Sequence, residues 1–174
     1  MQIGKGHAVR NVILTLVVFT LSTNAGGIMS AQSNTATTES RNKSVVEASF
    51  KTWSDGTGSP YNLLTDDATW TIVGRSAASK TYHGREAFMR EVIHPFNARM
   101  REPLKPAIRR IYTDGDTVIV FFDARGTARD GKPYVNTYAW FLDMRDGRVT
   151  AASAFFDSLE FNELWTRVTP LAAK

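Results

Sequence analysis

The sequence contains no cysteine, so no disulfide bond can stabilise the fold and the hydrophobic core alone must hold it together. A strong excess of one charge is also missing, because 21 basic residues face 17 acidic ones. The most basic stretch, "RMREPLKPAIRR", is interrupted by prolines and is interpreted as a solvated connection rather than a nucleic-acid surface. With 174 residues the chain is long enough for one domain with a substantial core, so we expect one domain and no nucleic-acid partner.

Long apolar runs are absent apart from residues 12–21. This run follows two basic residues, precedes small and polar ones, and has about half of the ~20 residues that a membrane span requires. The pattern is typical of a secretory signal peptide, residues 1–25, cleaved after Ala25 or, as the alternative, after Ala31. A retained membrane anchor is the competing interpretation. An exported protein without cysteines fits a bacterial periplasm or exterior, and no membrane contact is expected after cleavage.

The remaining sequence divides into a tether and a domain. Residues 26–42 are small and polar and are predicted to form a flexible tether, and residues 43–170 form the predicted domain. A helical pattern begins near Ser40, and its apolar face contains Val46, Phe50 and Trp53.

Two further helices and a strand are expected before residue 100. Ser59-Pro60 is interpreted as the N-cap and first position of a short helix, which the strand "DDATWTIVG" follows. A second helical face then contains Met89, Val92, Ile93 and Phe96. Because His94-Pro95 lies within it, we expect a kink or an early end there.

The second half is governed by Asp-Gly pairs at residues 114–115, 130–131 and 146–147, each between strand-like runs. Asp-Gly favours two-residue hairpin turns, since both positions accept positive φ. Four antiparallel strands are therefore predicted, over 107–113, 116–129, 132–145 and 148–157. The fold class is α+β, with helices first and a curved meander sheet behind them.

A two-residue turn fixes the register, so facing side chains can be predicted. The turns at 130–131 and 146–147 would pair Asn136 with both Arg125 and Asp157, and Tyr138 with both Asp123 and Phe155. The candidate catalytic residues on this face are Asp157, Arg125, Asp123, Tyr138 and Asn136. The candidate substrate contacts are Trp140, Phe121, Phe155, Trp53 and Trp70. Such an apolar cavity with a few polar groups is typical of a small-molecule site.

Three alternatives stay open for these residues. A β-bulge in either hairpin would move part of the polar row to the opposite face. Arg125 and Asp123 could form an ordinary ion pair, and Trp53, Trp70 and Trp165 could simply be core residues. The opposite face is also apolar, with Val118, Val120, Phe122, Val135, Ala139 and Phe141. A sheet apolar on both sides needs two covers, so we expect helices on one face and a homodimer partner on the other.

No cofactor or metal is expected. The sequence has no phosphate-binding glycine loop, no nucleophilic serine motif and no dinucleotide fingerprint, and His83 and His94 have no ligand partner at metal spacing.

Three segments resemble a known family. "LLTDDATWTIVGRS", "YHGREAF" and "DGRVTAASAFFDSLEF" are similar to the SnoaL-like branch of the nuclear-transport-factor-2-like superfamily, over residues 43–168. This cone-shaped α+β fold is shared by ketosteroid isomerase, polyketide cyclases and limonene epoxide hydrolase, and it hosts enzymes and plain binding domains alike.

The resemblance bears on the activity residue by residue. Where ketosteroid isomerase has its proton-shuttling Asp, this chain has Ile72 or Val73, and the isomerase Tyr falls near Phe50, so steroid isomerisation is disfavoured. The cyclases and the epoxide hydrolase keep an acid ten residues after the hairpin glycine, which corresponds to Asp157. Asp123 matches the second Asp of the epoxide hydrolase, but Phe121 occupies its Arg position and Arg125 lies on the other side of Asp123.

Two functions follow as hypotheses. The first is an exported acid/base enzyme, an isomerase, cyclase, dehydratase or hydrolase, acting on a small apolar molecule. Asp157 would be its general base, Arg125 and Asn136 its orienting partners, and Tyr138 a donor to developing oxyanion charge. The second is a non-catalytic ligand-binding or dimerisation domain. Asp157 also begins "DSLE", a capping box that explains this residue without catalysis.

The signal-peptide interpretation has a direct test. We expect the mature protein to begin near Gly26 or Gln32 and to be found outside the cytoplasm, because the apolar run with its basic flank directs export. N-terminal sequencing of the purified protein checks this. Recovery of Met1 or Gln2 from a soluble cytoplasmic fraction would contradict it.

Overall fold

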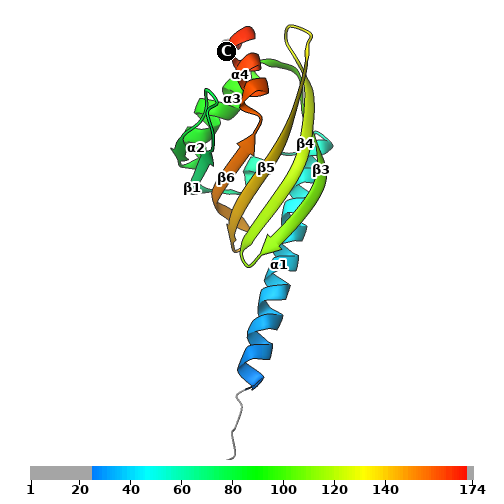
Figure 1. Ribbon diagram of the computed structural model, residues 1–174, viewed down its shortest axis with the longest axis vertical. Helices are drawn as coiled ribbons and strands as arrows, with labels where there is room; N and C mark the ends of the chain where they lie inside the picture. The colour runs from blue at the N-terminus through cyan, green and yellow to red at the C-terminus, as the bar shows by residue number, and fades with distance from the viewer. Residues whose placement is uncertain (1–24, 172–174) are drawn as a thin grey trace, which may run out of the picture.

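Six strands form one curved sheet, with helices packed against one of its faces (Figure 1). The structure is a computed structural model that describes residues 25–171. All but the last residue of the predicted signal peptide, residues 1–25, therefore lies outside the described residues. Within the described range, no helix is both long enough and apolar enough to span a membrane.

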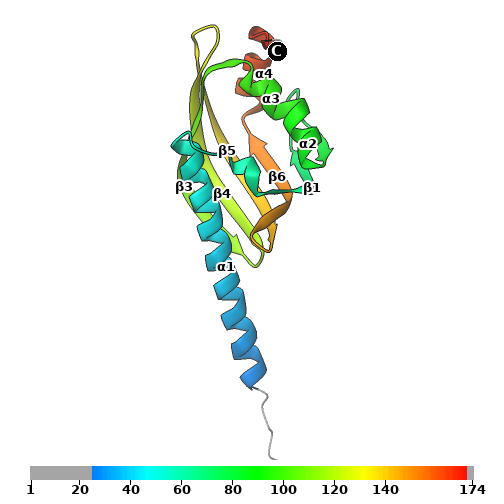
Figure 2. The same ribbon diagram turned by 180° about the vertical axis from the view of Figure 1, so that it is seen from behind.

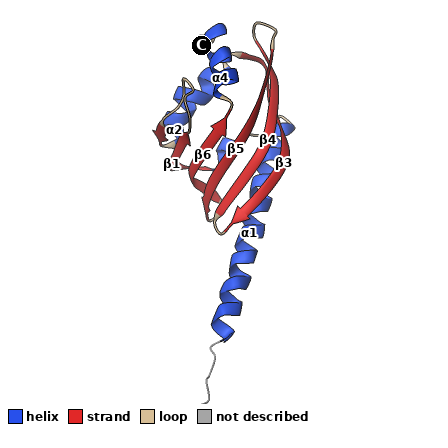
Figure 3. Ribbon diagram, in the orientation of Figure 1, coloured by secondary structure: helices blue, strands red, loops and turns tan. Residues whose placement is uncertain are grey.

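The α+β prediction is confirmed, and the order of elements is as expected (Figure 3). The helical segments are α1 (Ala25–Ser54), the 3-10 turn η1 (Pro60–Leu63), α2 (Arg85–Phe88), the π-helical segment η2 (Met89–Ile93), α3 (His94–Asn97) and α4 (Ser158–Arg167). The strands are β1 (Leu64–Ile72), β2 (Thr81–His83), β3 (Met100–Asp114), β4 (Thr117–Ala128), β5 (Pro133–Arg145) and β6 (Arg148–Phe156). Their order across the sheet is β2-β1-β6-β5-β4-β3, and β1 joins the antiparallel meander by pairing parallel to β6.

Helix α1 is longer than predicted. Val46 and Phe50 are buried, as the helical pattern predicted, and Phe50 packs on Phe122 of β4 with the ring centroids 4.9 Å apart. Residues 26–42, expected to form a flexible tether, continue the same helix toward its N-terminus. Figure 2 shows that α1 crosses the same face of the sheet as α2 and α3 and then projects beyond its lower end. We call this helix-covered face the inner face and the opposite one the outer face.

The helical segment around Pro95 neither kinks sharply nor ends early. Segment η2 makes one wide π turn and leads directly into α3, where Pro95 occupies the first turn. A π turn lets a helix accommodate a local irregularity such as a proline that lacks an amide proton. Phe88, Val92, Ile93 and Phe96 stay buried on one side of this continuous segment.

The stretch "RMREPLKPAIRR" is not a solvated connection, because it begins β3. The strand lies at the edge of the sheet, where Pro103 and Pro106 cost no ladder hydrogen bond to a second neighbour. Its pairing with β4 is shifted at three places, between residues 100 and 110.

The hairpin between β5 and β6 starts as predicted and then slips by one residue. The turn at 146–147 has φ values of 52° and 74°, which suit a two-residue turn, and Met144 pairs with Val149. The register then shifts between Asp143 and Met144, so Thr150 is an extra residue in β6. Every later residue of β6 therefore faces the side opposite to the predicted one.

The hairpin between β4 and β5 also differs from the prediction by one residue. Thr127 pairs with Pro133, so residues 129–132 form a longer connection instead of a two-residue turn. Arg125 consequently lies opposite Val135, and Asn136 lies opposite Ala124.

Both shifts divide the predicted polar face. The β5 residues Asn136, Tyr138, Trp140 and Leu142 lie on the inner face, where all four are buried. The residues that the shifts place on the outer face are Phe121, Asp123, Arg125 and Phe155, whereas Asp157 follows the end of β6 and is exposed. Conversely, Val118, Val120 and Phe122, which were predicted to face a dimer partner, are fully buried on the inner face.

Arg99, between α3 and β3, connects two helix ends. It is only 7% exposed, its guanidinium lies 4.0 Å from the Trp165 ring centroid, and it donates to the carbonyl oxygens of Pro95 and Trp165. No carboxylate is paired with it among the described residues. Burial lowers the pKa of this guanidinium, which still remains protonated. The contact holds α4 against the end of α3.

The outer face remains the expected homodimer surface, although with different residues. Large apolar side chains that are exposed or half-buried there are Tyr112, Ile119, Phe121, Val135, Phe141 and Phe155. The ring centroids of Phe141 and Phe155 are 5.8 Å apart, and the Phe141 side chain is 38% exposed. An apolar patch of this kind is costly to leave in water.

We expect the chain to sediment as a dimer at micromolar concentration and the Phe141→Glu variant as a monomer, because a carboxylate would be buried in an apolar interface. Leu159→Glu is the matched control, since Leu159 is 78% exposed but lies on α4, away from this face. Analytical ultracentrifugation measures all three. A monomeric wild type would refute the expectation.

Candidate functional site

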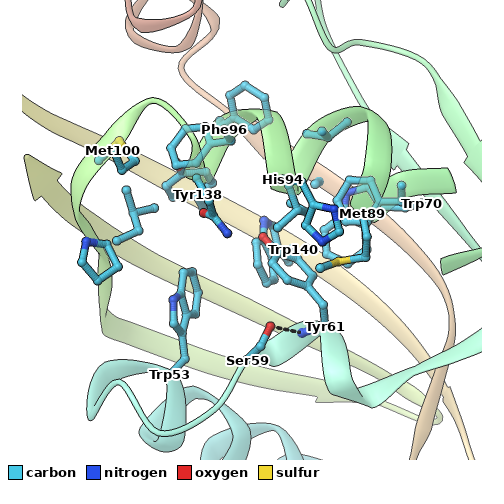
Figure 4. A pocket seen from close by; sticks show the side chains of 18 of the residues that line it. Trp53, Ser59, Tyr61, Trp70, Met89, His94, Phe96, Met100, Tyr138 and Trp140 are labelled. Atoms are coloured by element: carbon cyan, nitrogen blue, oxygen red, sulfur yellow. Dashed lines mark hydrogen bonds between the residues drawn. The ribbon is translucent and has the colours of Figure 1, made fainter. Parts of the chain in front are cut away.

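A cavity of about 530 Å³ opens between the inner face of the sheet and the helices (Figure 4). Its walls come from the end of α1, η1, the end of β1, the continuous α2–α3 segment, the start of β3, the middle of β5, the end of β6 and the start of α4. The lining is mainly aromatic and aliphatic. A cavity of this size and character is typical of a site for a small, largely apolar molecule.

Three tryptophans form much of the wall. The Trp53 ring lies parallel to the Trp140 ring with the centroids 5.9 Å apart, and the Trp70 ring meets Trp140 edge-on with the centroids 5.0 Å apart. All three line the cavity, whereas the other two predicted substrate contacts, Phe121 and Phe155, lie on the outer face. The ring of Tyr61, in η1, also lines the cavity. The Ser59 hydroxyl accepts a hydrogen bond from the Tyr61 amide and so fixes the start of η1.

The main polar group on the sheet side of the cavity is the Tyr138 hydroxyl. Asn136 is 3% exposed, and its amide orientation is fixed because Oδ1 accepts from the Asp157 amide at 3.0 Å while Nδ2 donates to the Asp157 carbonyl at 2.9 Å. Nδ2 also donates to the Tyr134 hydroxyl oxygen at 3.0 Å, and that hydroxyl lies 3.1 Å from the Tyr138 hydroxyl.

The distance between the Tyr134 and Tyr138 hydroxyls allows either one to donate, so we assign the direction from burial. The Tyr134 proton needs an acceptor inside the protein, and the Asn136 NH₂ group cannot accept. We therefore assign the Tyr134 proton to the Tyr138 oxygen, which leaves the Tyr138 proton for an acceptor in the cavity. Consecutive hydrogen bonds of this kind polarise one another and strengthen the terminal donor.

Both tyrosines at the cavity remain neutral at physiological pH. Burial, followed by the neighbouring Tyr134, raises the pKa of Tyr138 well above its usual value, and the same two causes raise the pKa of Tyr61. Each phenol is therefore a hydrogen-bond donor and not a base.

The other candidate catalytic residues do not meet in the cavity. Asp157 is exposed, and its carboxylate accepts from the Leu159 amide at 2.8 Å, so it caps α4. It does contact Asn136, but only through its own backbone. The capping alternative describes this geometry, whereas a general base in the cavity does not.

Asp123 belongs to a surface ion pair with a partner that was not foreseen. Its carboxylate accepts from Arg109 Nε at 2.7 Å and from the Thr137 hydroxyl at 2.7 Å. The hydrogen bonds from Thr137 and Arg109 lower the pKa of Asp123. Arg125 is exposed on the outer face and is not hydrogen-bonded to Asp123.

Within the described part of the chain, no Asp or Glu lines the cavity. Ile72 lines it at a position where the resemblance to ketosteroid isomerase would have required an acid. The titratable side chains at the lining are Tyr61, Tyr138, His94, Arg101 and Lys105. In the same residue range, no cluster of three His, Cys, Asp or Glu could hold a metal ion.

The sequence reasoning missed Tyr61, His94, Arg101 and Lys105 at the lining, and Tyr134 behind Tyr138. His94 was interpreted as an isolated histidine, yet its imidazole extends from the helix toward Met89 and Tyr61 at the cavity (Figure 4). Tyr134 could have been found, because residues 134, 136 and 138 alternate along one strand and must share a face whatever the register.

The comparisons with known proteins agree with this architecture. Residues 35–152 match the model of the SnoaL-like domain, so the chain belongs to the SnoaL-like family. The structure of Bal32a from a soil-derived mobile gene cassette is 21% identical with a TM-score of 0.62, and the match covers 74% of this chain and 98% of that one.

Two further structures have the same fold. TerC, co-crystallised with polyporic acid, is 23% identical with a TM-score of 0.58, and 72% of this chain and 98% of that one are covered. A Jannaschia sp. CCS1 protein assigned to the SnoaL-like polyketide cyclases is 17% identical with a TM-score of 0.57, over 71% and 93% of the two chains. Identities this low establish the fold alone. No curated protein is a significant sequence match.

The contrast between Asn136 and Asp157 is testable by stability. We expect Asn136→Ala to lower the free energy of unfolding by about 3 kcal/mol, because three buried or half-buried hydrogen-bonding groups lose their partner. Asp157→Asn should change it by less than about 0.5 kcal/mol, since Asn caps a helix as well as Asp. Chemical denaturation measures both, and an equal loss in the two variants would contradict the assignment.

Proposed function

We propose that this domain binds a small, largely apolar molecule that has a hydrogen-bond acceptor, such as a carbonyl oxygen, for the Tyr138 hydroxyl. The observation that carries the proposal is the aromatic cavity of about 530 Å³ with the Tyr138 hydroxyl at its wall. Trp53, Trp70 and Trp140 all line the cavity, which favours an apolar or aromatic ligand. The crystal structure of TerC with polyporic acid supports the idea that this fold can hold a small organic molecule.

The Tyr138 donor can be tested with two probes that differ in one polar group. We expect 2-acetylnaphthalene to bind about fivefold tighter than 2-ethylnaphthalene, because only the ketone can accept from the hydroxyl. Tyr138→Phe should remove that preference and leave the affinity for 2-ethylnaphthalene unchanged. Quenching of the cavity tryptophans, Trp140 above all, reports binding.

The control is Tyr112→Phe, because Tyr112 is exposed on the outer face, 56% accessible, and outside the cavity. If the wild type binds both probes equally, the assigned proton direction is wrong. If neither probe binds, the proposed function itself fails.

A second candidate is an acid/base enzyme with His94 in place of Asp157 as the base. It is favoured by one observation: a neutral phenol donor and an imidazole line the same cavity. A donor that stabilises enolate charge and a base that removes an α-proton are the two groups that isomerases and cyclases of carbonyl compounds require. The similarity to a protein assigned to the SnoaL-like polyketide cyclases supports this class of reaction.

Catalysis would be visible as exchange of the acetyl protons of 2-acetylnaphthalene in D₂O. We expect the wild type to accelerate the exchange, and His94→Gln to lose on the order of 10²-fold or more of it while keeping its affinity for the ketone. Asp157→Asn should exchange at the wild-type rate. Mass spectrometry follows the deuterium, and a wild type no faster than buffer would leave ligand binding as the function.

Export remains part of the proposal. The apolar run at residues 12–21 supports a signal peptide, and the absence of cysteine supports a bacterial periplasmic or secreted location. The apolar outer face supports a homodimer as the working form.

A further inference from the structure

The wall of the cavity holds hydrogen-bond donors that no other group of the protein uses. Trp70 and Trp140 are only 3% and 4% exposed, and in the described part of the chain neither indole N–H donates a hydrogen bond. An indole N–H can donate but cannot accept, and a buried one usually has a partner. Two such donors without a partner in one cavity indicate that a molecule from outside the chain provides the acceptor.

Both N–H groups can be reached from the cavity. Within residues 25–171, none of the fully enclosed side-chain polar atoms that lack a hydrogen bond belongs to a tryptophan, so each indole nitrogen borders open space. Because both side chains are almost completely buried and line the cavity, that open space is the cavity. Trp140 lies between Tyr138 and Trp70 in its wall (Figure 4).

Among the described residues, no strong acceptor is in place for these donors. The Trp70 and Trp140 rings meet edge-on with the centroids 5.0 Å apart, and a ring face is only a weak acceptor for an N–H group. The lining contains no Asp or Glu from that part of the chain. In the free protein the donors are therefore left to water, and a wholly apolar ligand that displaces this water would leave them unpaired.

We propose that the ligand has at least two separated acceptor oxygens, one for the Tyr138 hydroxyl and a second for an indole N–H of the Trp70–Trp140 pair. The chemical class is a mainly apolar or aromatic compound with two carbonyl groups or comparable oxygen acceptors. The Trp70–Trp140 pair is the part of the site that selects the second acceptor. The inference rests on the proposed binding function, which requires only one acceptor.

Two probes of the same shape test the second acceptor. 2,6-Diacetylnaphthalene has two ketone oxygens, and 2-acetyl-6-ethylnaphthalene has one. We expect the wild type to bind the diketone about fivefold tighter in calorimetry, because one further neutral hydrogen bond forms. The corresponding 2,7-substituted pair covers the other direction of the second oxygen, and the preference has to appear in at least one of the two pairs.

Variants of the tryptophans assign the preference to its donor. Trp70→Phe or Trp140→Phe should abolish it, because phenylalanine keeps an aromatic ring but has no N–H, and the loss of ring size affects both probes alike. Trp165→Phe is the matched control, since Trp165 lies outside the lining and its replacement should keep the preference.

The wild type also permits a direct measurement that does not depend on the folding of a cavity variant. With ¹⁵N-labelled tryptophan, the four indole N–H groups of the chain give four NMR signals. The signal of Trp70 or Trp140 should move downfield with the diketone relative to its one-ketone analogue, because a hydrogen-bonded proton is deshielded. The signal of Trp165 should be the same with both probes.

The inference is overturned if neither diketone is preferred by more than about twofold, the factor that two equivalent ends give by statistics alone. It is also overturned if no indole signal distinguishes the two probes. The proposed function fails differently, because in that case the one-ketone probes do not bind to the wild type at all.

Discussion

The packing of aromatic rings around Trp140 is the interaction on which the rest of this structure depends. Trp140 is buried at the middle of β5, and rings from four other elements contact it: Phe50 and Trp53 of α1, Tyr61 of η1, Trp70 of β1 and Phe122 of β4. Large rings contribute much of the buried apolar area of a small domain. Because Trp140 also lines the cavity, the hydrophobic core and the binding surface are one continuous layer. Substitutions there will change stability and ligand affinity together.

Much of the fold could be predicted from local patterns. The helical spacing of Val46 and Phe50 and the N-cap at Ser59 describe the structure well, because each depends on residues a few positions apart. The family resemblance placed these elements in the correct order. The parallel pairing of β1 with β6 is a long-range contact that no local pattern shows.

The candidate site was predicted correctly for Trp53 and Trp70, and for the residues that share strand β5. Asn136, Tyr138 and Trp140 alternate along β5 and therefore face the same side under any register. The predicted positions of Asp157, Asp123 and Arg125 depended on the pairing of neighbouring strands. One extra residue at Thr150 and a longer connection at 129–132 changed that pairing. An Asp-Gly pair indicates a turn but does not show whether a bulge follows it. The first part of β3, which contributes Met100 and Leu104 to the cavity, was missed because its prolines did not look like part of a strand.

The contacts of Arg99 between α3 and α4 affect how the protein responds to low pH. Most ion pairs lose their attraction in acid, when the carboxylate takes up a proton, and the pair of Arg167 with Asp130 is of that kind. The partners of Arg99 are two carbonyl oxygens and an indole ring, none of which titrates in the biological range. The contacts of Arg99 that attach α4 to α3 at this end of the cavity should therefore persist in acid, whereas an ion pair with a carboxylate would be lost.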